Sequence, residues 1–461
     1  MSKKMKLFWE AIKGEERDYT TISLKQAIFL LSVPMMLEMA GESLFALIDT
    51  FFVAQIGSDA VATIGFTETV MTLIYSMAIG LASAGTAMVA RRIGEKNQED
   101  ANIAAFQVIL LGVTIAISLG VLGFIYAEDI LRLIGASEQV ISTGIGYTRI
   151  MFATNIVIVL LFLLNGVFRG AGNASIAMWS LWIANGINIF LDPCFIFGLG
   201  PFPELGVEGA AVATSIGRGL GVVFQLYVLF FGTGKLRILG RHIRINFDMI
   251  KRLIRVSIGG TFQFIIASAS WIFLMRIVAK FGSEVVAGYV IAIRLLIFTL
   301  LPSWGIANAA ATLVGQNLGA GQPERAEQSA WQTAKYNMIF LLIVSIIYSI
   351  FAPSLIGIFS NETAVLESGI LSLRIISAGY IFFAYGMVLG QAFNGAGDTF
   401  TPTLLNFIAF WILEIPLAYA LSSYFDWGPT GVYVAVAFSE SILAILCIYV
   451  FRMGRWKEVV V

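Results

Sequence analysis

Long stretches of this chain are apolar on every side, without the single apolar stripe of a surface helix in a soluble protein. Residues 108–126, 156–164 and 338–351 show the pattern. A helix needs about 20 apolar residues to cross a bilayer, and apolarity all round indicates lipid or a buried bundle. Glycine, proline, asparagine and charged breaks predict twelve transmembrane helices, near 26–54, 60–90, 100–126, 137–167, 175–198, 207–232, 252–280, 285–315, 328–353, 365–392, 399–422 and 430–452.

Composition supports a membrane protein. Of 461 residues, 58% are hydrophobic and only 13% charged, against about 25% charged in soluble domains. The N-terminal segment 1–24 is rich in charged residues and lacks the apolar core of a cleavable signal. Cys194 and Cys447 lie in apolar surroundings, so we expect neither a disulfide framework nor a thiolate metal site.

Basic residues concentrate in alternate connections between the predicted helices. They lie in the N-terminal tail, at 91–96, at Arg169, at 235–255, at Arg325 and at 452–457, whereas the opposite connections hold few. The positive-inside rule therefore predicts that both termini are cytoplasmic, which fits an even helix count. The expected location is a prokaryotic plasma (inner) membrane.

The chain repeats itself at a constant offset, which carries Gly57 onto Gly282. Laying 57–101 over 282–326 gives eleven identities in 45 positions without a gap. The same offset carries the Phe168-Arg169-Gly170 turn onto Phe393-Asn394-Gly395. A single register held this far indicates an internal duplication.

The repeat predicts an all-α integral membrane fold of two six-helix bundles related by a pseudo-two-fold axis along the membrane normal. A unit with an even number of helices re-enters on the side that it left, so the copies are parallel. Two such bundles around a central cavity suit alternating access. The predicted segments are a cytoplasmic N-terminus (1–24), the first bundle (25–232), a cytoplasmic linker (233–250), the second bundle (251–453) and a cytoplasmic tail (454–461).

Three acids share one face of the first predicted helix. Glu38, Glu42 and Asp49 are spaced by four and seven residues, which places them within about 40° of one another at 100° per residue. An ionisable residue at mid-membrane costs roughly 2.5 to 3.5 kcal/mol on insertion scales. Each of these acids therefore needs a cavity, a partner or a proton.

The fifth predicted helix repeats the pattern with amides. Asn185, Asn188 and Asp192 follow at spacings of three and four, and Pro193 comes next. Proline removes a helical hydrogen bond, so we expect a partly unwound turn beside a carboxylate, which is typical of a cation site. Glu68, early in the second helix, is expected at similar depth. Crowded carboxylates in an apolar cavity can take up a proton, or bind Na⁺ together with asparagine oxygens.

The second half lacks this acid cluster, because the repeat places Leu274 opposite Asp49. Its isolated acids, Glu414 and Glu440, are expected to form ion pairs with arginines that only hold helices together. For Asp49 and Asp192 we expect a functional role, because no arginine is predicted at the same depth in the helices that carry them. Function is therefore predicted to be asymmetric within a symmetric scaffold.

Other functions find little support. The only glycine-lysine step, at Gly234, lacks the remaining P-loop residues, and no metal or nucleophile constellation of an enzyme is present. The single histidine, His242, is expected to be a solvated linker residue. The rival interpretation is a flippase for a lipid-linked oligosaccharide or other anionic lipid, based on intramembrane arginines that would favour phosphate: Arg149, Arg218, Arg294 and Arg374.

Several motifs resemble the multidrug and toxic compound extrusion (MATE) family over essentially the whole chain. They are Ile48-Asp49-Thr50 after Pro34, Phe168 to Asn173, Asn188 to Gly198, Gly209 to Thr214, Val314 to Gly321 and Asn394 to Thr399. The second half is uncharged around Ile266 and Ala384, where NorM-like members carry acids, so the chain looks more like the DinF branch. Glu38 and Glu42 exceed what that branch leads us to expect.

The resemblance implies a V-shaped, two-bundle exporter of amphipathic organic cations, driven by H⁺ or Na⁺ antiport and needing no other cofactor. By matching position, Asp49, Asn188, Asp192 and Thr214 correspond to its cation site, which would also hold Na⁺. Asn165 corresponds to a polar residue of the same bundle's cavity. The substrate cavity is predicted to include Glu38, Glu42, Glu68, Asn165 and Asn185. Expected partners are organic cations and membrane lipids, with no nucleic acid, and the protein is expected to be monomeric.

Overall fold

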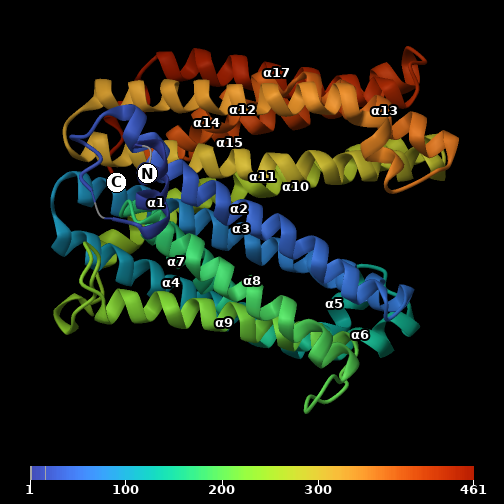
Figure 1. Ribbon diagram of the computed structural model, residues 1–461, viewed down its shortest axis with the longest axis horizontal. Coiled ribbons are helices and arrows are strands. Elements are labelled where there is room, and N and C mark those ends of the chain that lie inside the picture. Colours follow the sequence, from blue (N-terminus) through green and yellow to red (C-terminus); the bar gives the residue numbers. More distant parts are fainter. Residues whose placement is uncertain (1–2, 16) are drawn as a thin grey trace. The chain divides into compact units, whose positions relative to one another are not determined.

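The computed structural model describes residues 3–15 and 17–461, and this part of the chain is helical with no β-strand. The elements, in chain order, are α1 (Lys3–Lys13), α2 (Leu24–Ala54), α3 (Ser58–Gly94), α4 (Gln98–Ile125), α5 (Ala127–Leu133), α6 (Glu138–Ala153), α7 (Asn155–Gly170), α8 (Ala174–Phe197), α9 (Val207–Phe231), η1 (Gly240–His242), α10 (Phe247–Val278), η2 (Ala279–Phe281), α11 (Ser283–Gly319), α12 (Pro323–Gly357), α13 (Thr363–Ala378), α14 (Tyr380–Ala396), α15 (Phe400–Asn406), η3 (Phe407–Glu414), α16 (Ile415–Tyr419), η4 (Ala420–Tyr424), α17 (Pro429–Arg452) and η5 (Arg455–Glu458). Of the short segments, η3 and η4 are π-helical (Figure 1).

The twelve predicted spans are present. In the described residues, ten helical stretches are long and apolar enough to cross a membrane, and two bent helix pairs supply two more. The pair α6 and α7 bends by 44°, and the pair α13 and α14 by 56°. Their breaks lie at Thr154 and Gly379, and the repeat offset carries the first position onto the second. The duplication therefore extends to the position at which a span is broken.

Two helices were not predicted from the sequence. The helix α1 is amphipathic and lysine-rich, and α5 is a short helix directly after Tyr126, where α4 ends. Both are too short to span a bilayer. A search for long apolar stretches cannot detect them, because their stability depends on the surface against which they lie.

The chain divides into two compact units. Unit 1 comprises residues 1–17 and 37–261, and unit 2 comprises residues 18–36 and 262–461. The first turns of α2 therefore belong to unit 2, and the first turns of α10 belong to unit 1. The repeat offset carries Met36, at the first division point, onto Thr261, at the second. The start of α2 and the start of α10 are thus each assigned to the other unit, and the two division points are related by the repeat offset.

Glycines allow equivalent helices of the two units to approach closely. A Cβ atom on Gly170 of α7 would lie 2.7 Å from the carbonyl oxygen of Thr86 on α3. On Gly395 of α14 it would lie 2.2 Å from the carbonyl oxygen of Ala311 on α11. Real Cβ atoms do not come this near to a backbone oxygen, so only glycine permits these contacts. The repeat offset relates the first pair to the second.

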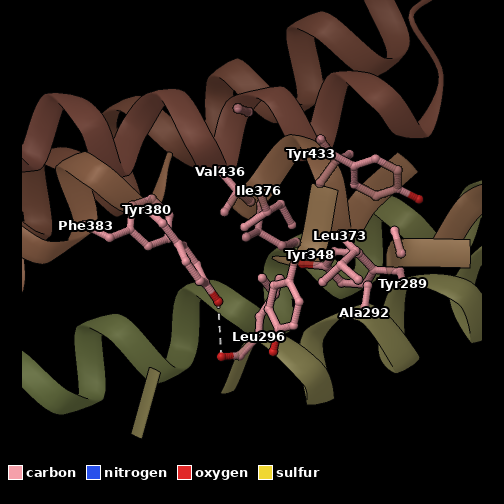
Figure 2. Close-up of a cluster of buried hydrophobic side chains, with 14 of the residues drawn as sticks. Tyr289, Ala292, Leu296, Tyr348, Leu373, Ile376, Tyr380, Phe383, Tyr433 and Val436 are labelled. Atoms are coloured by element: carbon pink, nitrogen blue, oxygen red, sulfur yellow. Dashed lines mark hydrogen bonds between the residues drawn. The ribbon is translucent and has the colours of Figure 1, made fainter. Parts of the chain in front are cut away.

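The core of unit 2 is rich in tyrosine. Figure 2 shows Tyr289, Tyr348, Tyr380 and Tyr433 among aliphatic side chains from α11, α12, α13, α14 and α17. The hydroxyl of Tyr380 donates to the backbone oxygen of Leu296 at 3.2 Å. Buried tyrosines normally find such partners. Among these four, the hydroxyl of Tyr289 has no partner in the described residues.

Candidate functional site

Asn188 joins the polar residues of α8 and α9 in unit 1. Its Nδ2 donates to Oδ1 of Asp192 at 3.2 Å and to Oγ1 of Thr214 at 3.1 Å. The helices approach closely here, since a Cβ on Gly217 would lie 2.6 Å from the carbonyl oxygen of Ala184. The structure thus brings together three of the four residues of the predicted cation site.

Asp49, the fourth residue, acts electrostatically on Asp192 across the space between α2 and α8. Two oxygen atoms of this group, Oδ1 of Asn188 and Oδ2 of Asp192, are buried and have no hydrogen-bond partner among the described residues. Unsatisfied buried oxygens are costly. A carboxylate and an amide oxygen with free lone pairs suit a small hard cation or a proton.

Arg218 on α9 lies in the middle of the acids. Its Nη2 donates to Oε1 of Glu42 at 2.8 Å, and its guanidinium lies 5.1 Å from the ring centroid of Phe45. Its charge also acts on Asp49 and on Glu68. The expectation concerned only the two helices that carry Asp49 and Asp192, α2 and α8. This arginine comes from a third helix, α9, which that expectation did not consider.

A second polar group is centred on Glu38, which is fully buried. Its Oε1 accepts from Nδ2 of Asn165 at 3.1 Å and lies 3.6 Å from Nη1 of Arg169. Nε2 of Gln225 in turn donates to Oδ1 of Asn165 at 2.6 Å. Glu38 and Asn165, both predicted to line a cavity, thus meet in one network, in which Oε2 of Glu38 and Oε1 of Gln225 have no partner among the described residues. Asn185 joins neither group, and its Nδ2 is buried without a partner among the described residues.

Glu68 on α3 is the remaining predicted site residue. Its Oε1 accepts from the hydroxyl of Tyr75 at 3.3 Å. Tyr75 follows seven residues later and therefore lies on the same helix face. This spacing could have identified Tyr75 from the sequence.

The signal for Arg218 and Gln225 was also present in the sequence. Thr214, Arg218 and Gln225 on α9 are spaced by four and seven residues, which repeats the spacing of Glu38, Glu42 and Asp49 on α2. One direct pair, Glu42 with Arg218, and one pair bridged by Asn165 connect these two faces. At 100° per residue, these spacings place the three polar side chains within about 40° of one another on one face of α9.

Three expectations were wrong. The helix α8 continues to Phe197 and is not unwound at Pro193. His242 is buried rather than solvated: its Nδ1 accepts from the backbone N–H of Leu239, and its Nε2 lies 3.0 Å from Oε2 of Glu99 and 3.2 Å from Nε of Arg241.

The third concerns Glu414 and Glu440, which have no ion pair in the part of the chain that the structure describes. They therefore do not hold helices together through arginines. Nor do the described residues contain a group of three or more His, Cys, Asp or Glu side chains that could hold a metal ion.

Comparisons with known proteins agree with the repeat. A family model described as MatE matches residues 34–194 and 260–420, two segments of equal length whose spacing is within one residue of the repeat offset. Among curated proteins, a FAD transporter of Shewanella oneidensis is 29% identical over 411 residues, covering 88% of this chain and 89% of that one. A probable multidrug resistance protein NorM of Thermotoga maritima is 26% identical over 437 residues, covering 94% of each.

Solved structures also match across the chain. The outward-facing conformation of a multidrug resistance MATE family transporter of the MOP superfamily superimposes with a TM-score of 0.89. It is 26% identical, and the match covers 94% of this chain and 96% of that one. The predicted helical architecture with two bundles is confirmed.

Proposed function

The chain belongs to the MatE family, the multidrug and toxic compound extrusion transporters, and from that premise we propose that it exports organic, mostly cationic compounds by exchange with H⁺ or Na⁺. The coupling ion binds among Asp49, Asn188, Asp192 and Thr214. Glu42, Glu68 and Asn185 contribute to the surface that receives the cargo. Relatives named as transporters support this class of activity over an enzymatic one.

One observation carries the proposal. The side chain of Asn188 holds Asp192 and Thr214 together, while one oxygen of Asn188 and one of Asp192 stay without a partner among the described residues. A group built only to hold α8 against α9 would use these oxygens internally. Leaving them free inside an apolar bundle favours a site that a cation or proton fills for part of a cycle.

The mechanism follows from competition for negative charge. A proton or Na⁺ at Asp192 neutralises a carboxylate that Asp49 otherwise repels. The neutral site attracts a cationic cargo less strongly, because the Coulomb attraction in a medium of low dielectric is lost. Binding of the coupling ion therefore favours cargo release, and departure of the ion restores the negative site. Alternating access exposes these two events to opposite sides of the membrane.

Glu38 and Asn165 are assigned a different role from the other acids. Their network with Arg169 and Gln225 leaves Glu38 fully buried. A buried pair of this kind stabilises the positions of α2, α7 and α9 relative to one another. We infer that it supports the cargo surface without contacting the cargo.

We also propose a cellular location and an oligomeric state for this protein. The protein lies in a prokaryotic plasma membrane with both termini cytoplasmic, as the basic connections indicate. Bacterial relatives support the type of membrane. It acts as a monomer without a cofactor other than the coupling ion, and each half of the family match lies within the same chain.

A second candidate is export of an anionic dinucleotide. A relative of 29% identity is named a FAD transporter, and Arg218 offers a cation within the acid cluster. Arginine suits phosphate groups. Against this, Arg218 is already bonded to Glu42. The same engagement weakens the flippase interpretation, as does Arg374, whose Nε donates to the backbone oxygen of Ser349 at 3.0 Å.

Proteoliposomes with separate H⁺ and Na⁺ gradients test the proposal. A fluorescent organic cation and FAD serve as the two probes. Gradient-driven export of the cation, lost in Asp192→Asn and in Asp49→Asn, is the expected result. The control Asp426→Asn lies in an exposed loop at φ 54°, which asparagine tolerates. Export of FAD alone would favour the second candidate, and retained export in both site variants would refute the proposed coupling site.

A further inference from the structure

We propose that Glu414 and Glu440 form a second proton-binding site, located in unit 2 on helices that carry none of the coupling residues. The inference deepens the proposed function and rests on it in one respect: the proton bound here is used to drive export. The proton site itself follows from contacts within unit 2. It is the feature that most clearly departs from the expected asymmetry between the two halves.

Glu414 lies at the end of the π-helical segment η3, directly before α16. Its side chain is 3% exposed, and its Oε2 has no hydrogen-bond partner among the described residues. Pro416 follows two residues later and cannot donate a backbone hydrogen bond. Single π-helical turns inside longer helices often mark functional positions. A carboxylate placed here needs a positive charge or a proton.

Glu440 on α17 is the neighbouring acid, and its charge acts on Glu414. The two acids lie at similar heights: Glu414 is ten residues from the end of η4, and Glu440 is eleven residues from the start of α17, which runs the opposite way. Within the described chain, neither carboxylate is within ion-pair distance of a basic side chain. Two carboxylates that repel each other in an apolar setting share a proton readily.

A buried hydroxyl without a partner points to the same place. Tyr289 is fully buried, its hydroxyl has no hydrogen-bond partner in the described structure, and Glu414 is its principal charged neighbour. The other three tyrosines of this core are satisfied: Tyr348 donates to Leu295, Tyr380 to Leu296, and Tyr433 bonds Ser368. Figure 2 labels Tyr289 and Tyr433 among the residues of this cluster. Their rings stack with centroids 5.7 Å apart.

Unit 2 contains a second buried hydroxyl without a hydrogen-bond partner among the described residues. On α17, the hydroxyl of Ser439, which precedes Glu440 in the sequence, is also buried without a partner among the described residues. Buried hydroxyls without a partner are rare in a well-packed interior. They are explained when one acid carries a proton, because hydroxyl groups both donate and accept and can reorient as the proton moves.

The charged and titratable groups around Glu414 and Glu440 favour a proton, rather than a metal cation, as the species that this site binds. From α17 they are Tyr433 and Cys447, and from α11 Tyr289. Lys280 lies over the ring of Tyr419 on α16, with 4.7 Å between its ammonium and the ring centroid, and makes no ion pair in the described residues. The rest of the surroundings is the aliphatic and aromatic core. So few oxygen atoms suit a proton better than Na⁺, which needs a full shell of oxygen ligands.

Infrared spectroscopy on the purified full-length protein tests the site without relying on transport. The carboxylic-acid C=O band is followed during a pH titration. Loss of one component of this band in Glu414→Gln and in Glu440→Gln, with the band retained in Glu362→Gln, is expected. Glu362 is an exposed acid outside the spans. Unchanged spectra in both variants would overturn the proposal, as would a band in wild-type protein that Na⁺ removes and pH does not.

A second measurement relates the site to transport. In proteoliposomes, the number of protons exchanged per cargo molecule is obtained from the membrane potential at which net transport stops. Fewer protons per cargo molecule are expected in Glu440→Gln. This variant replaces Glu414→Gln in the test if Glu414→Gln does not fold. An unchanged ratio together with unchanged spectra rejects the second site. A failure of the proposed function can be told apart from a failure of the second site. If only the proposed function fails, Asp49→Asn leaves gradient-driven export unchanged, while the infrared band of Glu414 is still observed.

Discussion

Nη2 of Arg218 on α9 donates to Oε1 of Glu42 on α2 at 2.8 Å, which places a guanidinium among the acids of unit 1. The two residues are 176 positions apart in the chain. Their side chains are 11% and 25% exposed, so water screens the pair only in part. The pair therefore both connects the two helices and reduces the negative charge that a coupling ion meets.

Removing one partner of this pair should destabilise the protein. For Arg218→Gln we expect a loss of about 3 kcal/mol of unfolding free energy, because Glu42 is left as an uncompensated charge. The double variant Glu42→Gln/Arg218→Gln should recover most of this loss. Thermal unfolding in detergent measures it. Equal and additive losses in the two single variants would show that the pair contributes nothing beyond its separate members.

Asn188→Ala should reduce cation-driven transport by at least about tenfold, corresponding to about 1.4 kcal/mol or more. The substitution removes the donor that Asp192 and Thr214 share. The matched control, Asn361→Ala, changes an exposed asparagine and should transport like wild type. Initial rates in proteoliposomes make the comparison. Wild-type rates in Asn188→Ala would mean that the amide only holds helices together.

Two glycines on α9 provide a test of helix spacing at the site. A Cβ on Gly217 would lie 2.6 Å from the carbonyl oxygen of Ala184, whereas one on Gly219 would meet only Val157 at 3.8 Å. Gly217→Ala should cost about 1 to 3 kcal/mol by overpacking and lengthen the bond between Asn188 and Thr214. Gly219→Ala should be neutral or slightly stabilising, since alanine favours the helix. Similar stability and transport in the two variants would contradict the close approach.

The cytoplasmic linker should depend on its histidine. His242 bonds the backbone of Leu239 and reaches Glu99 on α4, so His242→Ala should free the segment between α9 and α10. Faster limited proteolysis of this segment is expected, with transport rates little changed. Arg237→Ala is the control, because the Arg237 side chain is exposed in the same linker and exposed charges contribute little. Equal protease resistance in the two variants would show that the linker is held by other contacts.

Much of the fold was predictable because its signals are local. The apolar length of each span, the breaks at glycine and proline, and the internal repeat are properties of consecutive residues. Insertion into a bilayer selects for them segment by segment. The face carrying Glu42 and Asp49, and the Asn188 to Asp192 spacing, follow from the period of a single helix.

The sequence by itself thus determined the spans, the duplication and the acidic face of the first half. Only the tertiary structure decided which side chains meet. It brought Arg218 to Glu42, enclosed Glu38 with Asn165, buried His242 and left Glu414 without a cation among the described residues. The physical reason is that a pair between distant helices depends on the rotation and height of both helices. The periodicity of one helix fixes neither quantity; the packing of its neighbours fixes both.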